Sequence, residues 1–148
     1  MESPGEIRFY SRKNPRYYFL TNFYSSPFEL DSYEWKTVEH YFQAMKFVEH
    51  PDYFHSVRQC ITPSRAKSLG RTRNYPLRED WEEVKEDIML KALYAKFEQN
   101  PLLKDQLLDT GNCILIEDSP TDYYWGIGKR GTGKNRLGHL LMRVRDEI

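Results

Sequence analysis

Three polar residues in the first third of the chain have the types and the spacing of an acid-base site. Glu39, Gln43 and Lys46 stand at positions i, i+4 and i+7. On a helix they form one polar stripe, beside an apolar stripe that includes Val38 and Phe42. A carboxylate at such a border is partly desolvated, which raises its pKa and suits it to act as an acid, a base or a stabiliser of positive charge. Periodicity alone favours the plainer alternative, an exposed Glu-Gln-Lys face with modest i, i+4 pairing.

A glycine-rich basic loop near the C-terminus is a second candidate site. Residues 126–131 spell GxGxxG, but no acidic residue in a βαβ unit follows about 20 positions on. Residues 128–134 fit GxxxxGK, but Asn135 replaces the Ser or Thr that binds magnesium, so neither motif is accepted. A basic loop before a helix start suits a phosphate, because backbone N–H groups, side-chain charge and the helix dipole add. A solvated basic loop is an equal alternative. The cations are Lys129, Arg130, Lys134 and Arg136.

Metal and serine-triad chemistry have little support in the sequence. The histidines form no HExxH pattern, and the two cysteines form no CxxC pair. No serine lies in a GxSxG elbow. We therefore expect neither a bound metal nor a cofactor. The residues concerned are His40, His50, His55, His139, Cys60 and Cys113.

Composition and charge favour one folded domain over residues 1–148. Lys plus Arg and Asp plus Glu each total 22, so the net charge is zero and a polyanion must be met by a local patch. Mean hydropathy is -0.78, but 11 Tyr, 8 Phe and 3 Trp supply apolar area that a disordered chain lacks. Unpaired cysteines and the absence of a leader pattern or a long apolar run predict a reduced, cytoplasmic setting without a membrane.

Periodicity and turn signals predict a mainly α fold with a small β element. Thr37 is expected to cap a helix that ends before Pro51, and Asn135 to cap the last helix. Further helices are expected over 62–70, 79–99 and 101–108. Expected strands span 7–10 and 113–116, with a hairpin over 28–35. The inner face of the last helix is expected to include Leu137, Leu140, Leu141 and Val144.

Several short blocks of sequence occur in a specific order. They are FLTNFY at 19–24, VEHYFQAMKF at 38–47, LGR at 69–71, WEEVK at 81–85, KAL at 91–93 with Lys96 and Phe97, Asp122 with WG at 125–126, and GKNRLG at 133–138. Over residues 9–145 their order and spacing resemble the YbiA-like family, also called the NADAR family. The departures are Met45 where Gln is usual, Thr21 where Ser is common and Ser25 where Pro often stands. None of them removes an acid or a base.

The resemblance implies a single YbiA-like domain and hydrolysis of an N-glycosidic bond. Two substrate classes are associated with relatives: ribosylamino-pyrimidine phosphates of early riboflavin synthesis, and ADP-ribose attached to guanine, free or within nucleic acid. The runner-up is a non-catalytic module that binds ADP-ribose or a nucleotide. The implied catalytic residues are Glu39, Lys46 and Asp122, and the implied substrate-binding residues are Asn22, Phe23, Tyr24, Arg71, Trp81, Trp125, Gly126, Lys134, Asn135 and Arg136.

The residue types suit this chemistry. Breaking a ribose C1–N bond builds positive charge on the sugar, so the resemblance assigns the natural acid pair to Glu39 and Asp122. Aromatic rings could stack on the base, worth about 1 to 3 kcal/mol per base, although at least one tryptophan is expected in the core. Two roles for Lys46 stay open: a point charge that holds an anion, or an amine that attacks C1 and forms a Schiff base.

Overall fold

The computed structural model describes residues 5–148 and divides into two compact units. Unit 2 comprises residues 25–99, and unit 1 comprises the described residues up to 24 together with residues 100–148. Each unit is described by itself. The single-domain organisation stays a prediction. Over the described residues, no helix combines the length and the apolarity needed to cross a membrane.

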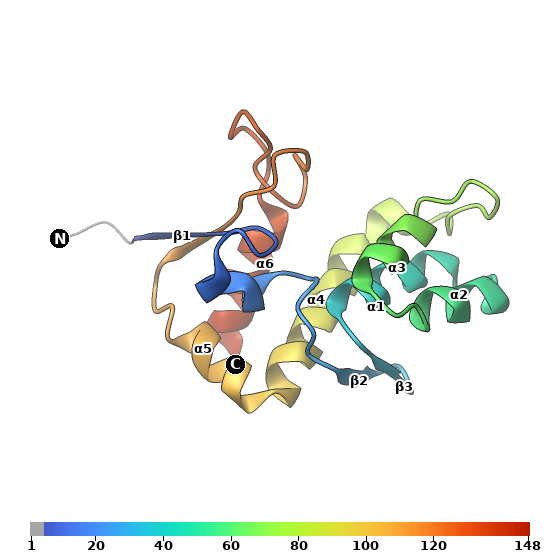
Figure 1. Cartoon of the computed structure of the whole chain (residues 1–148), viewed down its shortest axis with the longest axis horizontal. Coiled ribbons are helices and arrows are strands. Elements are labelled where there is room, and N and C mark those ends of the chain that lie inside the picture. The colour runs from blue at the N-terminus through green and yellow to red at the C-terminus, as the bar shows by residue number, and fades with distance from the viewer. Residues whose placement is uncertain (1–4) are drawn as a thin grey trace. The chain divides into compact units, whose positions relative to one another are not determined.

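Unit 2 is a set of helices preceded by a hairpin (Figure 1). Its elements are β2 (Phe28–Leu30), β3 (Tyr33–Trp35), α1 (Val38–Ala44), the 3-10 turn η2 (Met45–Phe47), α2 (Pro51–Arg58), α3 (Pro63–Leu69) and α4 (Trp81–Gln99). The two strands pair antiparallel, with Phe28 opposite Trp35. Asp31 and Ser32 both have positive φ, 54° and 73°, as a two-residue hairpin turn whose twist matches its strands requires. The predicted hairpin is confirmed.

Helix α1 is the centre of unit 2. It packs against α2, α3 and α4, and every residue from Val38 to Ala44 is buried. The Thr37 side chain caps it as predicted, because its Oγ1 accepts a hydrogen bond from the His40 N–H at 3.1 Å. The expectation of an exposed Glu-Gln-Lys face is wrong for Glu39 and Gln43, since the neighbouring helices cover that side as well.

The helical boundaries in unit 2 follow their capping signals, with one exception. Thr62 accepts a hydrogen bond from Arg65 N at 3.1 Å at the start of α3, as the Thr-Pro pair predicts. The helix expected to run on towards Pro51 ends as an α-helix at Ala44 and tightens into the 3-10 turn η2. Helix α2 was not predicted, although Pro51 stands at its first turn, where proline favours a helix start.

Unit 1 contains a small sheet that pairs a strand near the N-terminus with a strand far along the chain. Its elements are β1 (Glu6–Phe9), the 3-10 helix η1 (Pro15–Leu20), α5 (Pro101–Leu108), β4 (Ile114–Glu117) and α6 (Arg136–Glu147). Strand β1 pairs parallel with β4, with Ile7 opposite Leu115. Of the strand expected to be buried, Leu115 and Ile116 are buried, whereas Ile114 is 39% exposed. The small sheet and the helices confirm the mainly α fold with a minor β element.

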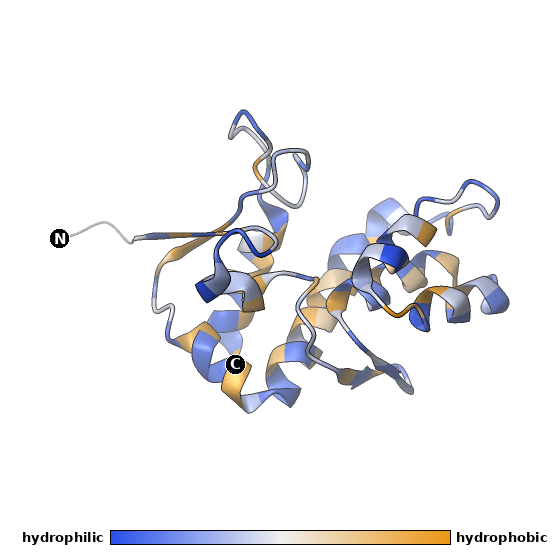
Figure 2. Ribbon diagram, viewed as in Figure 1, coloured by the Kyte–Doolittle hydropathy of each residue, from blue (hydrophilic) through white to orange (hydrophobic). Residues whose placement is uncertain are grey.

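Helix α6 packs against β4 at close range. Its predicted inner face is confirmed, because Leu137, Leu140, Leu141 and Val144 are all buried. A Cβ at Gly138 would overlap the carbonyl oxygen of Leu115, so only glycine allows this approach. Between β4 and α6 the chain makes a long loop that is mostly hydrophilic or neutral, whereas the helices carry hydrophobic stretches (Figure 2).

Candidate active site

Glu39 is a buried carboxylate held in one orientation. It lies in the first turn of α1 and is 6% exposed. One helical turn later, Gln43 donates a hydrogen bond from Nε2 to Glu39 Oε1 at 2.8 Å. The carboxylate therefore has little freedom to reorient, and a charge that appeared near it would meet an acceptor already in place.

Lys46 lies on η2 at the end of the same helix and is half-buried. Its Nζ makes a long hydrogen bond of 3.5 Å to the carbonyl oxygen of Gly70. Burial lowers the pKa of Lys46; the charge of Glu39 opposes this effect, and the charges of Arg71 and Lys67 add to it. Lys46 is thus more readily deprotonated than a surface lysine.

Two aromatic rings cover the Lys46 amine. The Nζ lies 5.7 Å from the ring centroids of both Phe42 and Trp81. Those rings meet edge to face, with centroids 5.0 Å apart. Trp81 is only 7% exposed, so the alternative of core packing holds for much of its surface. The rings lie over the amine and so add to the burial that lowers the pKa of Lys46.

Gln43 and Gly70 fit closely together beside this group. Gln43 is 5% exposed, and within residues 5–148 its Oε1 has no hydrogen-bond partner. Gly70 is buried, and a Cβ there would overlap the Gln43 carboxamide. Glycine at position 70 therefore makes room for the amide. Sequence reasoning placed Gln43 on the polar stripe but did not select it as a site residue.

Arg78 supports the turn that carries Lys46 and was not predicted as part of the site. Its backbone N–H donates to Lys46 O at 3.2 Å, and its Nη1 contacts Met45 O at 3.5 Å. Asp80 holds the guanidinium through two hydrogen bonds of 2.7 and 3.1 Å. This forked pair stabilises η2 from the segment ahead of α4. The only signal in the sequence for this pair was that Arg78 stands two residues before Asp80, just ahead of α4.

Arg71 is the remaining predicted site residue of unit 2. It directly follows Gly70 after α3, and its side chain is exposed. Unit 2 therefore brings together Glu39, Lys46, Trp81 and, through its charge, Arg71. The other predicted site residues lie in unit 1.

Asp122 builds a turn in the loop between β4 and α6. Its Oδ1 accepts hydrogen bonds from the backbone N–H groups of Tyr124 and Trp125, at 2.9 and 2.8 Å. The rings of Tyr124 and Trp125 pack edge to face, with centroids 4.9 Å apart. The carboxylate thus has a structural task in its own unit. Its predicted pairing with Glu39 is untested, because the two residues belong to different units.

Three N–H groups at the start of α6 are already engaged by backbone carbonyl oxygens. The backbone N–H groups of residues 135–137 donate to the carbonyl oxygens of residues 124–126, each at 3.0 Å. These three donors are therefore not available for the predicted combination of glycine-rich loop and helix N-terminus. Lys134 is exposed, with its Nζ 5.6 Å from the centroid of the Tyr124 ring, and Arg136 is half-buried. Phosphate binding here depends on these two side chains and stays a prediction.

Asn135 stands at the N-cap position but does not cap α6 with its side chain. Instead, its Nδ2 donates to Leu115 O and its Oδ1 accepts from Glu117 N, both at 2.9 Å. Its φ of +51° lies in the left-handed region that asparagine tolerates. Asn135 joins the loop to β4, so the prediction that its side chain caps α6 is wrong. Both ends of its amide are already engaged.

The other predicted residues of unit 1 lie in two segments. Asn22, Phe23 and Tyr24 follow η1 and are half-buried, and the Tyr24 ring meets Tyr18 edge to face at 5.4 Å. Gly126 is buried, and a Cβ there would overlap the carboxylate and the carbonyl oxygen of its neighbour across the loop, residue 117. Glycine at position 126 therefore allows the loop backbone to pack closely against residue 117.

The NADAR domain model matches residues 8–148. The chain belongs to the NADAR family. N-glycosidase YbiA of Escherichia coli is 46% identical over 142 residues, which are 96% of this chain and 88% of that protein. N-glycosidase Npun_R5314 of Nostoc punctiforme is 41% identical over 144 residues, 96% of this chain and 92% of that protein. Riboflavin biosynthesis protein PYRR, chloroplastic, of Zea mays is 43% identical over 127 residues, 80% of this chain but only 20% of that protein.

The fold is that of its NADAR relative. The NMR structure of E. coli YbiA superposes with a TM-score of 0.88 at 44% identity, covering 99% of this chain and 86% of that one. The resemblance found in the sequence and the mainly helical fold that it implied are both confirmed.

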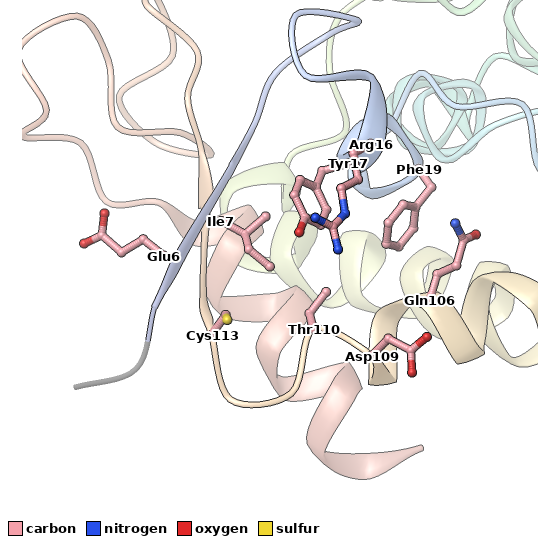
Figure 3. Close-up of a pocket in the computed structure, with 9 residues that line it drawn as sticks. All are labelled: Glu6, Ile7, Arg16, Tyr17, Phe19, Gln106, Asp109, Thr110 and Cys113. Carbon is pink, nitrogen blue, oxygen red and sulfur yellow. The ribbon is translucent and has the colours of Figure 1, made fainter. Parts of the chain in front are cut away.

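Unit 1 also contains a cavity of about 440 Å³ (Figure 3). Arg16 and Tyr17 enter it from η1, and Thr110 and Cys113 line it from the segment between α5 and β4. None of the predicted site residues lines this cavity. Over residues 5–148, no three side chains of His, Cys, Asp or Glu gather in a group suited to a metal ion.

Proposed function

We propose that this protein is an N-glycosidase that hydrolyses the bond between C1 of a phosphorylated ribosyl or ADP-ribosyl group and a nitrogen of a base. The main observation in support is the buried Glu39 carboxylate, which Gln43 holds on α1. The half-buried Lys46 follows on η2. The reaction adds water across the C1–N bond: the sugar gains a hydroxyl, and the base nitrogen gains a proton.

The hydrolytic activity follows from family membership. Two relatives that align over 96% of the chain are named N-glycosidases, so the chain is a hydrolase of N-glycosyl bonds. The maize relative named for riboflavin biosynthesis supports ribosylated pyrimidine phosphates as one substrate class. ADP-ribosylated guanine is the second class and is proposed from the family resemblance of the sequence blocks.

Glu39 has the properties of a group that stabilises the transition state. Departure of the base leaves oxocarbenium-like positive charge on the ribose. A buried carboxylate fixed by a hydrogen bond stabilises such a charge without reorganising, and low polarity around it strengthens the attraction. The same carboxylate can accept a proton from the attacking water.

Lys46 has two roles open to it. As an ammonium it would hold an anionic group of the substrate. As a neutral amine it would attack C1, so that the C1–N bond to the base breaks and the ribose ring opens to a Schiff base. Water would then add to that imine, restore the amine and release the sugar. The lowered pKa of Lys46 supports the second role because the neutral amine is the nucleophile.

The competing function is a binding module without catalysis. Such a module would use the aromatic rings and the cations but would not need a buried, oriented carboxylate, whose desolvation carries a cost. Glu39 therefore favours the enzyme.

Product formation separates the two functions. The protein is incubated with ADP-ribosylated guanosine, ADP-ribosylated DNA and ribosylamino-pyrimidine phosphates, and mass spectrometry measures released ADP-ribose or sugar phosphate. We expect release from at least one substrate. Calorimetric binding without product from any of them would establish the binding module instead. Neither binding nor product would overturn both functions.

A further inference from the structure

The orientation of the Gln43 carboxamide is determined by its neighbour. Its Nε2 donates to the Glu39 carboxylate at 2.8 Å. The reversed amide would place Oε1 against the Glu39 oxygen, where two acceptors repel each other. Oε1 therefore points to the other side of the amide.

That oxygen is buried and has no donor. Gln43 is 5% exposed, and no donor in the part of the chain that the structure describes reaches Oε1. A buried acceptor left unsatisfied costs about 1 to 3 kcal/mol, and such groups are few in native proteins. Gly70 keeps the amide in this position by having no Cβ. Oε1 is thus a buried acceptor that packs beside Gly70 and that no donor of the described residues satisfies.

We propose that Gln43 Oε1 accepts a hydrogen bond from the hydroxyl on C2 of the substrate ribose, which makes Gln43 a residue that selects ribose. The inference rests on the proposed function. Anionic groups carry no donor, so a phosphate cannot satisfy this oxygen. Glu39 acts at C1, and the C2 hydroxyl is the nearest donor on the sugar to that carbon. Hydrogen bonds to this hydroxyl strengthen as a glycosidic transition state develops.

The test compares two substrates and two proteins. The substrate that the wild type cleaves and its analogue lacking the C2 hydroxyl are each hydrolysed by the wild type and by Gln43→Met, which keeps the side-chain length but removes the acceptor. We expect Gln43→Met to lower kcat/KM about 10- to 100-fold more on the ribosyl substrate than on the deoxy analogue. Losing the hydrogen bond to Glu39 affects both substrates, so it cancels in this comparison.

Controls separate recognition from folding. Gln59→Met, at an exposed glutamine after α2, should leave both rates unchanged. Gln43→Asn withdraws the acceptor by one methylene and serves as a second variant if Gln43→Met unfolds. It should show the same difference between substrates.

Equal losses on the two substrates would overturn the role of Gln43 and leave the glycosidase intact. That result would also be obtained if Oε1 accepted a hydrogen bond from the base of the substrate and not from the C2 hydroxyl. A wild type that cleaves no ribosyl substrate would overturn the proposed function, and the role of Gln43 with it.

Discussion

Gln43 Nε2 and Glu39 Oε1 are joined by a 2.8 Å hydrogen bond across one turn of α1. The bond requires only an acceptor on residue 39. A glutamine at that position still supplies a carbonyl oxygen, so Glu39→Gln removes the charge and leaves the contact. The pair therefore allows the electrostatic role of Glu39 to be separated from its packing.

Glu39→Gln should lower turnover by about 100-fold or more while the fold and ligand binding persist, because it removes an acid-base or electrostatic group. Steady-state kinetics and calorimetry measure the two quantities. Glu83→Gln, on the exposed side of α4, is the matched control and should retain wild-type turnover. Near wild-type turnover in Glu39→Gln would remove Glu39 from the mechanism.

Lys46 should form a trappable adduct if it is the nucleophile. Borohydride added during turnover would reduce a Schiff base to a stable amine, which mass spectrometry locates, and Lys46→Arg would be nearly inactive. Lys96 is an internal control: burial lowers its pKa to about 7, yet its side chain is fully buried and out of reach of substrate. No adduct on Lys46 together with an active Lys46→Arg variant would make Lys46 a positioning charge.

Replacing Lys134 and Arg136 by alanine should chiefly raise KM for a phosphorylated substrate, and that KM should depend less on salt. Because the N–H groups of residues 135–137 are engaged by carbonyl oxygens, the two side chains are the groups expected to contact the phosphate. Kinetics at two ionic strengths measure the effect. Unchanged affinity for the phosphorylated substrate would leave the loop as ordinary surface.

Asn135→Ala should destabilise the fold. The change removes one buried and one part-buried hydrogen bond to β4 and leaves a backbone donor and a backbone acceptor without these partners. It also puts alanine at a positive φ. We expect the free energy of unfolding in urea to fall by about 2 to 4 kcal/mol. Asn135→Asp retains the acceptor for Glu117 N and should lose less. A fully stable Asn135→Ala protein would contradict this structural role.

Lys96 should make stability rise with pH. Burial lowers its pKa in the folded chain to about 7, whereas an unfolded lysine titrates near pH ~10.4. Between these values the unfolded chain holds the extra proton, so the free energy of unfolding increases with pH, by at most about 1.4 kcal/mol per unit. Below pH ~7 both states are protonated, and this slope vanishes.

Denaturation of the wild type and of Lys96→Met at several pH values isolates this contribution. The wild-type free energy of unfolding minus that of the variant should climb with pH across the window. Lys129→Met, at an exposed lysine, should show no such climb. A difference that stays flat from neutral to alkaline pH would mean that Lys96 keeps its proton when buried.

Local signals predicted most of the secondary structure. Thr37, Thr62 and Pro101 mark helix starts because capping and the fixed φ of proline act within one turn of chain. Asp31 and Ser32 mark the hairpin because a two-residue turn is likewise a local feature of the chain. The start of α2 at Pro51 carried a signal of this kind and was still missed, since the preceding helical pattern ran up to it.

The chain's own sequence thus indicated most of the helices, the hairpin and, through its ordered blocks, the family and the three catalytic candidates Glu39, Lys46 and Asp122. Tertiary structure alone decided what surrounds them. Helices α2, α3 and α4 cover α1 on sides that periodicity left open, so Glu39 is buried where an exposed face was favoured. The fit of Gly70 against Gln43 and the engagement of Asn135 with β4 join residues about 20 or more positions apart. Spacing along one element carries no information about such contacts, because they depend on how separate elements pack.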